Sequence, residues 1–171
     1  MKTLILPLFL TFLLFVSGNK TACSCSCIGD NSVKQEIKNS NEVFLGEVVN
    51  IDTIKLHFHE GNIYFFRLKV DIRVISIFKG RLNSGFISVY SGIGDGDCGY
   101  SFQLGKEYLI YADFKTRHFN FSNSVQKFLY TDICKRTCEL NNEELNEIMK
   151  YRKPRSPKKR AKCLINKPVD Y

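Results

Sequence analysis

The sequence lacks the motifs by which most enzymes and metal proteins are recognised. It has no glycine-rich phosphate loop, no Gly-x-Ser-x-Gly segment and no Cys-x-x-Cys pair of the kind that binds structural zinc. Of its three histidines, His57 and His59 lie two residues apart, which polar positions in a hairpin explain better than a metal site. Gly94-Asp95-Gly96-Asp97 lacks the further acidic ligands of a calcium loop and predicts a turn. We therefore expect neither an enzyme nor a bound cofactor.

Long apolar runs are equally scarce, because only residues 4–16 form one, so we expect no transmembrane segment. This run follows a positive start and precedes small residues, which is the order of a secretory signal peptide over residues 1–22. Cleavage after Gly18 or after Ala22 fits the small residues required before the cut. The second cut makes Cys23 the first residue of a secreted, extracellular or periplasmic chain, and acylation there would anchor the chain to lipid.

The middle of the chain lacks net positive charge, although the formal net charge of the whole chain is +8. Residues 150–171 hold nine of the 25 Lys and Arg residues and one acid, whereas residues 23–149 hold 14 basic and 16 acidic residues. We interpret residues 23–149 as a near-neutral domain and residues 150–171 as a basic, disordered tail. The tail is either a solvated arm or a binding segment for an anionic surface such as lipid, polysaccharide or nucleic acid.

Cysteine is abundant for a domain of this size. In an exported chain such residues indicate disulfides. Their number is odd, so at least one of them is free, acylated or bonded to another molecule. Spacing does not choose the pairs among the seven: Cys23, Cys25, Cys27, Cys98, Cys134, Cys138 and Cys163.

Strand patterns dominate the rest of the sequence. Between residues 66 and 74, apolar residues alternate with charged ones, which predicts a half-buried antiparallel strand. No helix pattern separates the successive strands, so we expect a mainly β fold, either a small closed barrel or a sandwich. The expected strands cover residues 42–51, 63–78, 86–90, 107–114 and 126–130.

Two short helices are expected beside these strands. Ser32 begins the first as an N-cap, with Gln35 as its capping-box partner and with Val33 and Ile37 facing inward. The second begins at Asn141, which has Glu144 three residues further on. Its expected apolar stripe consists of Leu145, Ile148 and Met149.

Several short segments, in order along residues 23–148, resemble the tissue inhibitors of metalloproteinases and their bacterial single-domain relatives, the netrin-like inhibitor domains. The resemblance implies a five-stranded OB-type Greek-key barrel with short flanking helices and a disulfide-stapled N-terminus. The segments are Cys25-Ser26-Cys27, Val43-Phe44-Leu45-Gly46-Glu47-Val48, Ile77-Phe78-Lys79-Gly80, Cys98-Gly99, Gly105-Lys106-Glu107-Tyr108-Leu109 and Tyr130-Thr131-Asp132-Ile133-Cys134.

The same resemblance implies which cysteines pair. In the family, the two cysteines of the N-terminal pair bond to two later ones. Applied to Cys25 and Cys27, this predicts bonds to Cys98 and Cys134, respectively. A second register remains open, because Cys23 and Cys25 form another Cys-Ser-Cys pair that would bond to the same two partners. The leftover cysteine would then be available to Cys138 or Cys163.

The resemblance also implies a function, inhibition of a zinc metalloendopeptidase. In animal members of the family, the α-amino group and carbonyl of the first cysteine chelate the protease zinc and displace its catalytic water. Here Cys23 would chelate that zinc if the mature chain starts there. The implied inhibitory ridge consists of Cys23, Ser24, Cys25, Ser26 and Cys27. The alternative is a non-inhibitory secreted or lipid-anchored OB-type binding module.

Overall fold

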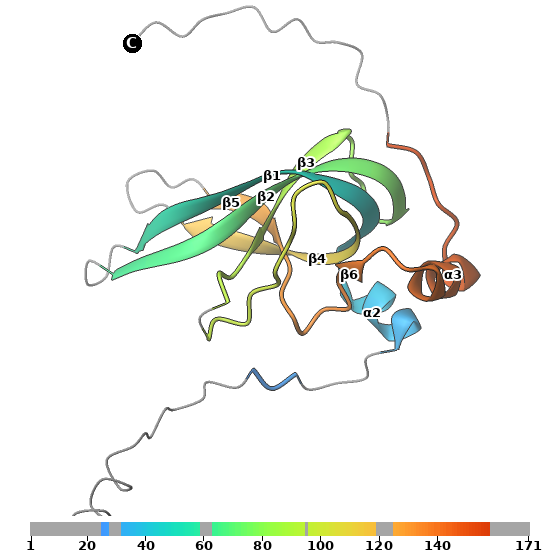
Figure 1. Ribbon diagram of the computed structural model, residues 1–171, viewed down its shortest axis with the longest axis horizontal. Coiled ribbons are helices and arrows are strands. Elements are labelled where there is room, and N and C mark those ends of the chain that lie inside the picture. The colour runs from blue at the N-terminus through green and yellow to red at the C-terminus, as the bar shows by residue number, and fades with distance from the viewer. Residues whose placement is uncertain (1–24, 28–31, 59–62, 95, 119–124, 158–171) are drawn as a thin grey trace, which may run out of the picture.

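The computed structural model describes residues 25–27, 32–58, 63–94, 96–118 and 125–157 (Figure 1). Within these ranges the fold is mainly β, with six strands in one sheet, two short helices and two disulfides. Expected signal-peptide residues 1–22 lie outside the described part. The elements are α2 (Val33–Asn39), β1 (Glu42–Phe58), β2 (Ile63–Lys79), β3 (Phe86–Ser91), β4 (Glu107–His118), β5 (Val125–Tyr130), β6 (Cys138–Glu139) and α3 (Asn142–Tyr151).

The strand pairings form a series that begins and ends at β1. β1 pairs with β2 and β2 with β3, both antiparallel. β3 then pairs in parallel with β5 through Val89↔Leu129 and Tyr90↔Tyr130. β5 pairs with β4, and β4 pairs with the start of β1, again antiparallel. All five segments expected as strands lie in β1 to β5, and the two-residue β6, which was not expected, adds to β4.

The pairing of β1 with β2 is irregular at the place where β1 also contacts β4. The register shifts at three points between residues 43 and 50 of β1, and the extra residue lies on β2 at the first two shifts and on β1 at the third. Such bulges bend a strand and increase its twist. Gly46 lies in this stretch, and a Cβ atom there would come within 2.4 Å of the Ile72 side chain and 3.0 Å of the Arg73 carbonyl oxygen. The glycine of the Val-Phe-x-Gly-x-Val segment therefore allows β1 and β2 to approach closely at the bend.

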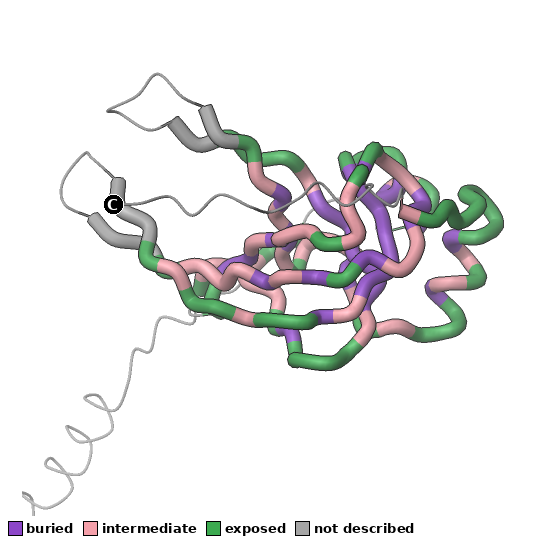
Figure 2. The backbone as a smooth tube through the Cα atoms, turned by 90° about the horizontal axis from the view of Figure 1, so that it is seen from above, coloured by how far each residue is buried: buried purple, intermediate pink, exposed green. Residues whose placement is uncertain are grey.

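The apolar core has two parts, one on each side of β1 and β4. Figure 2 shows that buried positions gather toward the helical end of the strands and thin out toward the ends of the long hairpins. The inner cluster contains Phe44, Val48, Val70, Ile72, Val74, Ile77, Leu82, Val89, Phe102, Tyr108, Ile110, Ala112 and Leu129. The outer cluster, which packs the helices on the sheet, contains Val33, Ile37, Val43, Leu45, Phe78, Leu109, Tyr111 and Ile148.

The expected alternation along β2 is confirmed near the centre and fails at the hairpin end. Val70, Ile72 and Val74 are at most 5% exposed, and Arg73 on the opposite face is exposed. Phe66 belongs to the same face by period but is 46% exposed. Its position near the hairpin end carries it beyond the core cluster, so the period predicted its face but not its burial.

Both helices begin at the residues that the sequence predicts. The Gln35 N–H donates to the Ser32 hydroxyl at 3.3 Å, and the Glu144 N–H donates to the Asn141 side chain at 2.8 Å. In α3, Ile148 is fully buried but Met149 is 42% exposed. The expected stripe is therefore wrong at Met149, because α3 packs through residues 144 and 148, which lie on one side of the helix.

The Phe-Lys-Gly segment at the end of β2 joins the first helix to the sheet. The Lys79 ammonium donates to the carbonyl oxygens of Ile37, Lys38 and Ser40 at 2.7, 2.8 and 2.5 Å, and so satisfies the carboxyl end of α2. Gly80 follows with φ 101°, and a Cβ atom there would overlap the buried Glu42 carboxylate. The lysine at position 79 thus satisfies the end of α2, and the backbone at position 80 requires glycine.

The domain boundary expected after Met149 falls inside α3. α3 continues to Tyr151, and Arg155 forms an antiparallel bridge with Ile77 of β2. The first basic residues of the expected tail therefore belong to the folded domain, because backbone hydrogen bonds hold them there. Residues 158–171 lie outside the described part. No helix in the described ranges is long and apolar enough to cross a membrane.

Candidate functional site

Two disulfides connect the start of the described chain to two distant segments. Cys25 bonds to Cys98 and Cys27 bonds to Cys134, with Cα–Cα distances of 5.7 and 5.1 Å. These are the pairs that the resemblance implied for the Cys25/Cys27 register. The other register required Cys25 to bond to Cys134, and the structure pairs Cys25 with Cys98 instead. We name residues 25–27 the N-terminal ridge.

The two segments that anchor this ridge lie side by side. The Ile133 N–H donates to the Cys98 carbonyl oxygen at 3.0 Å, so the loop before β4 and the segment after β5 meet beneath the ridge. Ser26 lies exposed between the two bridged cysteines. Ile93 and Ile133, one from each anchoring segment, are 39% and 48% exposed. The resulting surface is a short exposed peptide bonded at both ends, with one exposed apolar side chain in each anchoring segment.

Asp97 organises the loop at residues 92–99. Its carboxylate accepts from the N–H groups of Ile93, Gly94 and Gly99 at 3.0, 3.0 and 3.2 Å. Arg67 of β2 donates to the same carboxylate at 3.0 Å. Partial burial raises the pKa of Asp97, but the backbone N–H groups and the guanidinium outweigh this effect and hold the pKa below its ordinary value. The loop that carries Cys98 is thus tied to β2.

Replacement of Asp97 by asparagine is expected to lower the free energy of unfolding by about 1.5–3 kcal/mol, because charged hydrogen bonds in the loop are lost. Because the folded pKa of Asp97 is lowered, its contribution is fully present above the unfolded pKa of about 3.9 and is lost as the pH falls through the folded value. Denaturant unfolding of both proteins between pH 2 and pH 7 measures this difference. Asp52→Asn, at an exposed position of β1, is the control. A difference between wild type and Asp97→Asn that stays constant to pH 2 would contradict the assignment.

Buried hydroxyl groups hold the backbone before and after Cys134. The Thr131 hydroxyl donates to the Tyr111 carbonyl oxygen at 2.9 Å and lies 2.7 Å from the Thr137 hydroxyl. The Tyr111 N–H donates to Thr137 at 3.0 Å. Thr131 and Thr137 are 0% and 5% exposed. The segment between them is thus attached to the middle of β4 at both ends.

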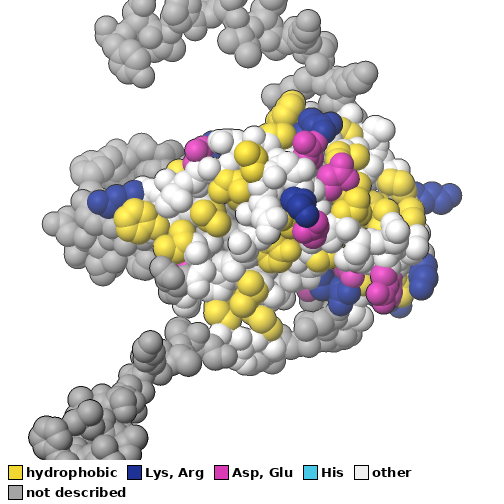
Figure 3. Space-filling model, viewed as in Figure 1, with side chains coloured by type: hydrophobic (Ala, Val, Ile, Leu, Met, Phe, Trp, Pro, Cys, Tyr) yellow, Lys and Arg dark blue, Asp and Glu magenta, His cyan; other side chains and the backbone are white. Residues whose placement is uncertain are grey.

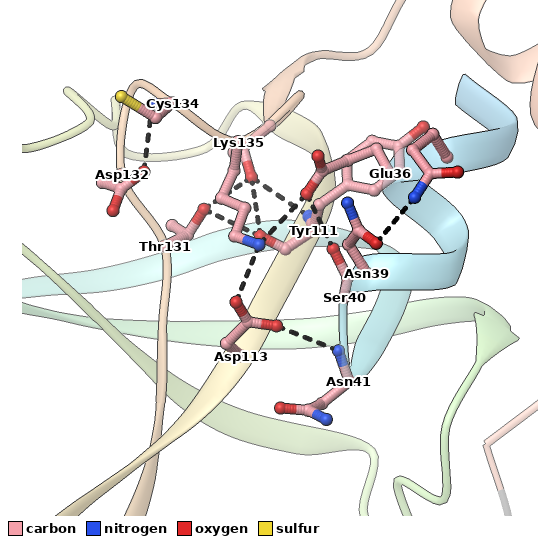
Figure 4. Close-up of polar contacts among 12 residues, drawn as sticks. Glu36, Asn39, Ser40, Asn41, Tyr111, Asp113, Thr131, Asp132, Cys134 and Lys135 are labelled. Atoms are coloured by element: carbon pink, nitrogen blue, oxygen red, sulfur yellow. Dashed lines mark hydrogen bonds and ion pairs between the residues drawn. The ribbon is translucent and has the colours of Figure 1, made fainter. Parts of the chain in front are cut away.

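Lys135 lies beside Cys134 and joins this segment to α2 and β4 (Figure 4). Its ammonium group lies 2.7 Å from Asp113 and 3.2 Å from Glu36. Burial lowers the pKa of Lys135, but the two carboxylates outweigh burial and raise it above its ordinary value. Asp113 in turn accepts from the Asn41 N–H at 3.1 Å, so the network reaches the start of β1.

Arg136 forms a second connection, to α3. Its guanidinium pairs with the Glu144 carboxylate through two hydrogen bonds. The fully buried Tyr111 donates its hydroxyl to Glu144 at 2.6 Å, and burial together with this carboxylate raises the pKa of Tyr111 well above its ordinary range. Lys135 and Arg136 thus fix the residues next to the disulfide on three different elements.

The structure describes only some of the remaining sequence candidates. Cys23, Ser24, His59 and Cys163 lie outside the described residues, as do the side chains of His57 and His118. Cys138 is a free, half-buried cysteine on β6, and burial raises its thiol pKa. In the described ranges, no three His, Cys, Asp or Glu side chains are grouped so that they could hold a metal ion.

On one face of the domain, the surface charges do not gather by sign. On the face shown in Figure 3, acidic and basic side chains lie next to one another over the end that carries the helices, and apolar side chains are scattered between them. This mixture is consistent with the near-neutral composition of residues 23–149.

Sequence reasoning did not identify Asp97, Lys135 or Arg136 as residues that build the site. Asp97 carries a usable signal, because an aspartate among glycines often accepts hydrogen bonds from its own turn. Lys135 and Arg136 carry none, because most of their partners lie far away in the sequence. No family model and no curated protein matches this chain.

Proposed function

We propose that this chain is a secreted inhibitor of zinc metalloendopeptidases that inserts the N-terminal ridge into the active-site cleft of its target. The observation that carries the proposal is the pair of disulfides that holds exposed Ser26 between two bonded cysteines. A peptide fixed in this way loses little conformational entropy on binding, which favours affinity. Exposed Ile93 and Ile133 supply apolar contact area in the two segments that anchor it.

The proposed scaffold is an OB-type Greek-key barrel. The continuous series of pairings β1-β2-β3-β5-β4-β1, with β3 and β5 parallel, supports this assignment. The pairings are of unequal length, since β1 and β2 pair over most of their residues whereas β3 and β5 pair at two positions. On this scaffold, both anchoring segments of the ridge are continuous with strands of the series.

The proposed chemistry is zinc chelation in trans by Cys23. A neutral α-amino group and the carbonyl of the same residue form a five-membered chelate that replaces the water of an open zinc site. This step requires a mature chain that starts at Cys23 with an unmodified amine. Export, which the two disulfides support, would provide the cleavage.

A second function, a non-inhibitory secreted or lipid-anchored binding module, is favoured by one observation. The bonded cysteines are Cys25 and Cys27, so Cys23 lies two residues before the first bridge. In this case the ridge and its apolar neighbours contact a partner protein without presenting an amine to zinc.

The first experiment is to determine the N-terminus and the non-reduced mass of the exported protein, followed by titration against zinc endopeptidases. A chain that starts at Cys23 is expected to inhibit at a one-to-one ratio. Ser26→Arg is expected to weaken inhibition at least tenfold, whereas Asn146→Arg, at an exposed position of α3, is expected to have no effect. Adding one alanine before Cys23 should abolish inhibition. Absence of inhibition by a chain with a free Cys23 amine would reject the inhibitor and leave the binding module.

A further inference from the structure

The edge of β2 that faces away from β1 is covered by different segments of the chain along its length. β3 pairs with residues 68–73, and the Val74 N–H donates to the Gly85 carbonyl oxygen at 2.9 Å. Beyond this point, β2 pairs with no strand on this side in the described part of the chain. Ile77 instead bonds to Arg155: the Ile77 N–H donates to the Arg155 carbonyl at 2.8 Å, and the Arg155 N–H donates to the Ile77 carbonyl at 2.9 Å.

Arg155 also bonds through its side chain. Its guanidinium donates to the Gly80 carbonyl oxygen at 2.9 Å, just past the end of β2. The bridge does not lengthen in the direction of Pro157. The next pair of the antiparallel ladder would need an N–H donor two residues after Arg155, and proline has none. In the described part of the chain, the hydrogen bonds that attach residues 152–157, which we name the strap, to the sheet are those of Arg155.

The edge beneath the strap has the composition of a strand that pairs readily. Residues 75–78, which β3 and Gly85 leave unpaired on this side, read Ile-Ser-Ile-Phe, with no charge and two β-branched residues. Windows of high β-propensity and low charge associate edge to edge when they are open, and natural proteins cover such edges. A backbone edge of this kind is also self-complementary, because antiparallel pairing about one residue relates two copies by a two-fold axis.

We propose that the strap covers this edge and prevents it from pairing with a second copy of this chain. Arg155 holds the strap in place, and we call this residue the latch. When the latch is removed, β2 of one copy pairs antiparallel with β2 of another around Ile77. The uncharged residues 75–78 support a second copy as the partner, because Ile77 of one copy and Ile77 of the other would exchange the same two backbone bonds that Arg155 now makes. This inference concerns the β2 edge and is independent of the N-terminal ridge.

The test uses full-length oxidised protein with Arg155→Pro. The proline ring removes the N–H donor and puts a carbon atom where the hydrogen met the Ile77 carbonyl, so the strap should detach. Ser156→Pro is the matched control, because alternate residues of an extended chain direct their N–H groups to opposite sides and both Ile77 bonds remain. Arg155→Ala keeps the backbone bonds and removes only the bond to Gly80.

Two measurements decide the outcome. Hydrogen exchange of the Ile77 amide, at a concentration where the protein is monomeric, should accelerate at least tenfold in Arg155→Pro, less in Arg155→Ala and not in Ser156→Pro. Sedimentation should show a concentration-dependent dimer for Arg155→Pro only. Unchanged Ile77 exchange in Arg155→Pro would overturn the latch. Faster exchange without a dimer would overturn the guarded interface. If Arg155→Pro does not fold, an unchanged Ile77 exchange rate in Arg155→Ala would likewise overturn the side-chain latch.

Discussion

Replacing Cys27 and Cys134 together by serine is expected to lower the free energy of unfolding by roughly 4 kcal/mol. The bond has a sequence separation of 107 residues, but Cys25–Cys98 still closes most of that loop, so the variant restores to the unfolded chain the conformational freedom of the part beyond Cys98. This is a large share of the 5–15 kcal/mol that stabilises a typical domain. Denaturant unfolding at pH 7 measures the loss.

The same variant should also free one end of the N-terminal ridge, so its binding to any partner should weaken. Cys138→Ser is the control, because it removes a half-buried free thiol and leaves both bonds intact. Equal stability of the double variant and the wild type would mean that Cys27 and Cys134 are not bonded in solution.

Replacement of Lys135 by methionine is expected to cost about 3–5 kcal/mol, because breaking a buried ion pair from one side leaves the other charges uncompensated. The Lys135 side chain is 18% exposed, and it faces Glu36 at 7% and Asp113 at 25%. The raised pKa of Lys135 sets the pH range of the effect. The contribution is fully present below the unfolded pKa of about 10.4 and is lost as the pH rises through the folded value.

Lys106→Met provides the matched control for this prediction. Lys106 pairs with Glu139 at 2.6 Å, but their side chains are 49% and 50% exposed, so solvent screens the pair and its loss should lower the free energy of unfolding far less than the loss of Lys135. Unfolding of both variants by denaturant compares a buried and an exposed pair in one protein. Similar losses for the two variants would show that the network around Lys135 does not stabilise the domain.

Local signals in the sequence were sufficient for most of the secondary structure. The caps at Ser32 and Asn141 act within three residues of themselves, so their partners are adjacent in the sequence. The alternation through Val70, Ile72 and Val74 is likewise local, because successive side chains of a strand point to opposite faces. The five main strands and both helices were therefore predictable from the order of the amino acids alone.

Features that depend on distant residues were not predictable in this way. Spacing could not choose the cysteine pairs, and the resemblance left two registers open until Cys25 was found bonded to Cys98. Lys135 meets Glu36 and Asp113 only because α2, β4 and the segment after β5 converge. The bridge from Arg155 to Ile77 likewise joins residues that only the fold brings together.

The physical reason is the range of the interactions concerned. Hydrophobic periodicity and helix capping act over a few residues, so both can be predicted from the order of the amino acids. Disulfides, buried ion pairs and edge contacts depend on which segments meet in space, and packing of the whole sheet decides that. Residue order thus accounts for the strands and helices of this protein, whereas tertiary packing accounts for the N-terminal ridge and for the strap.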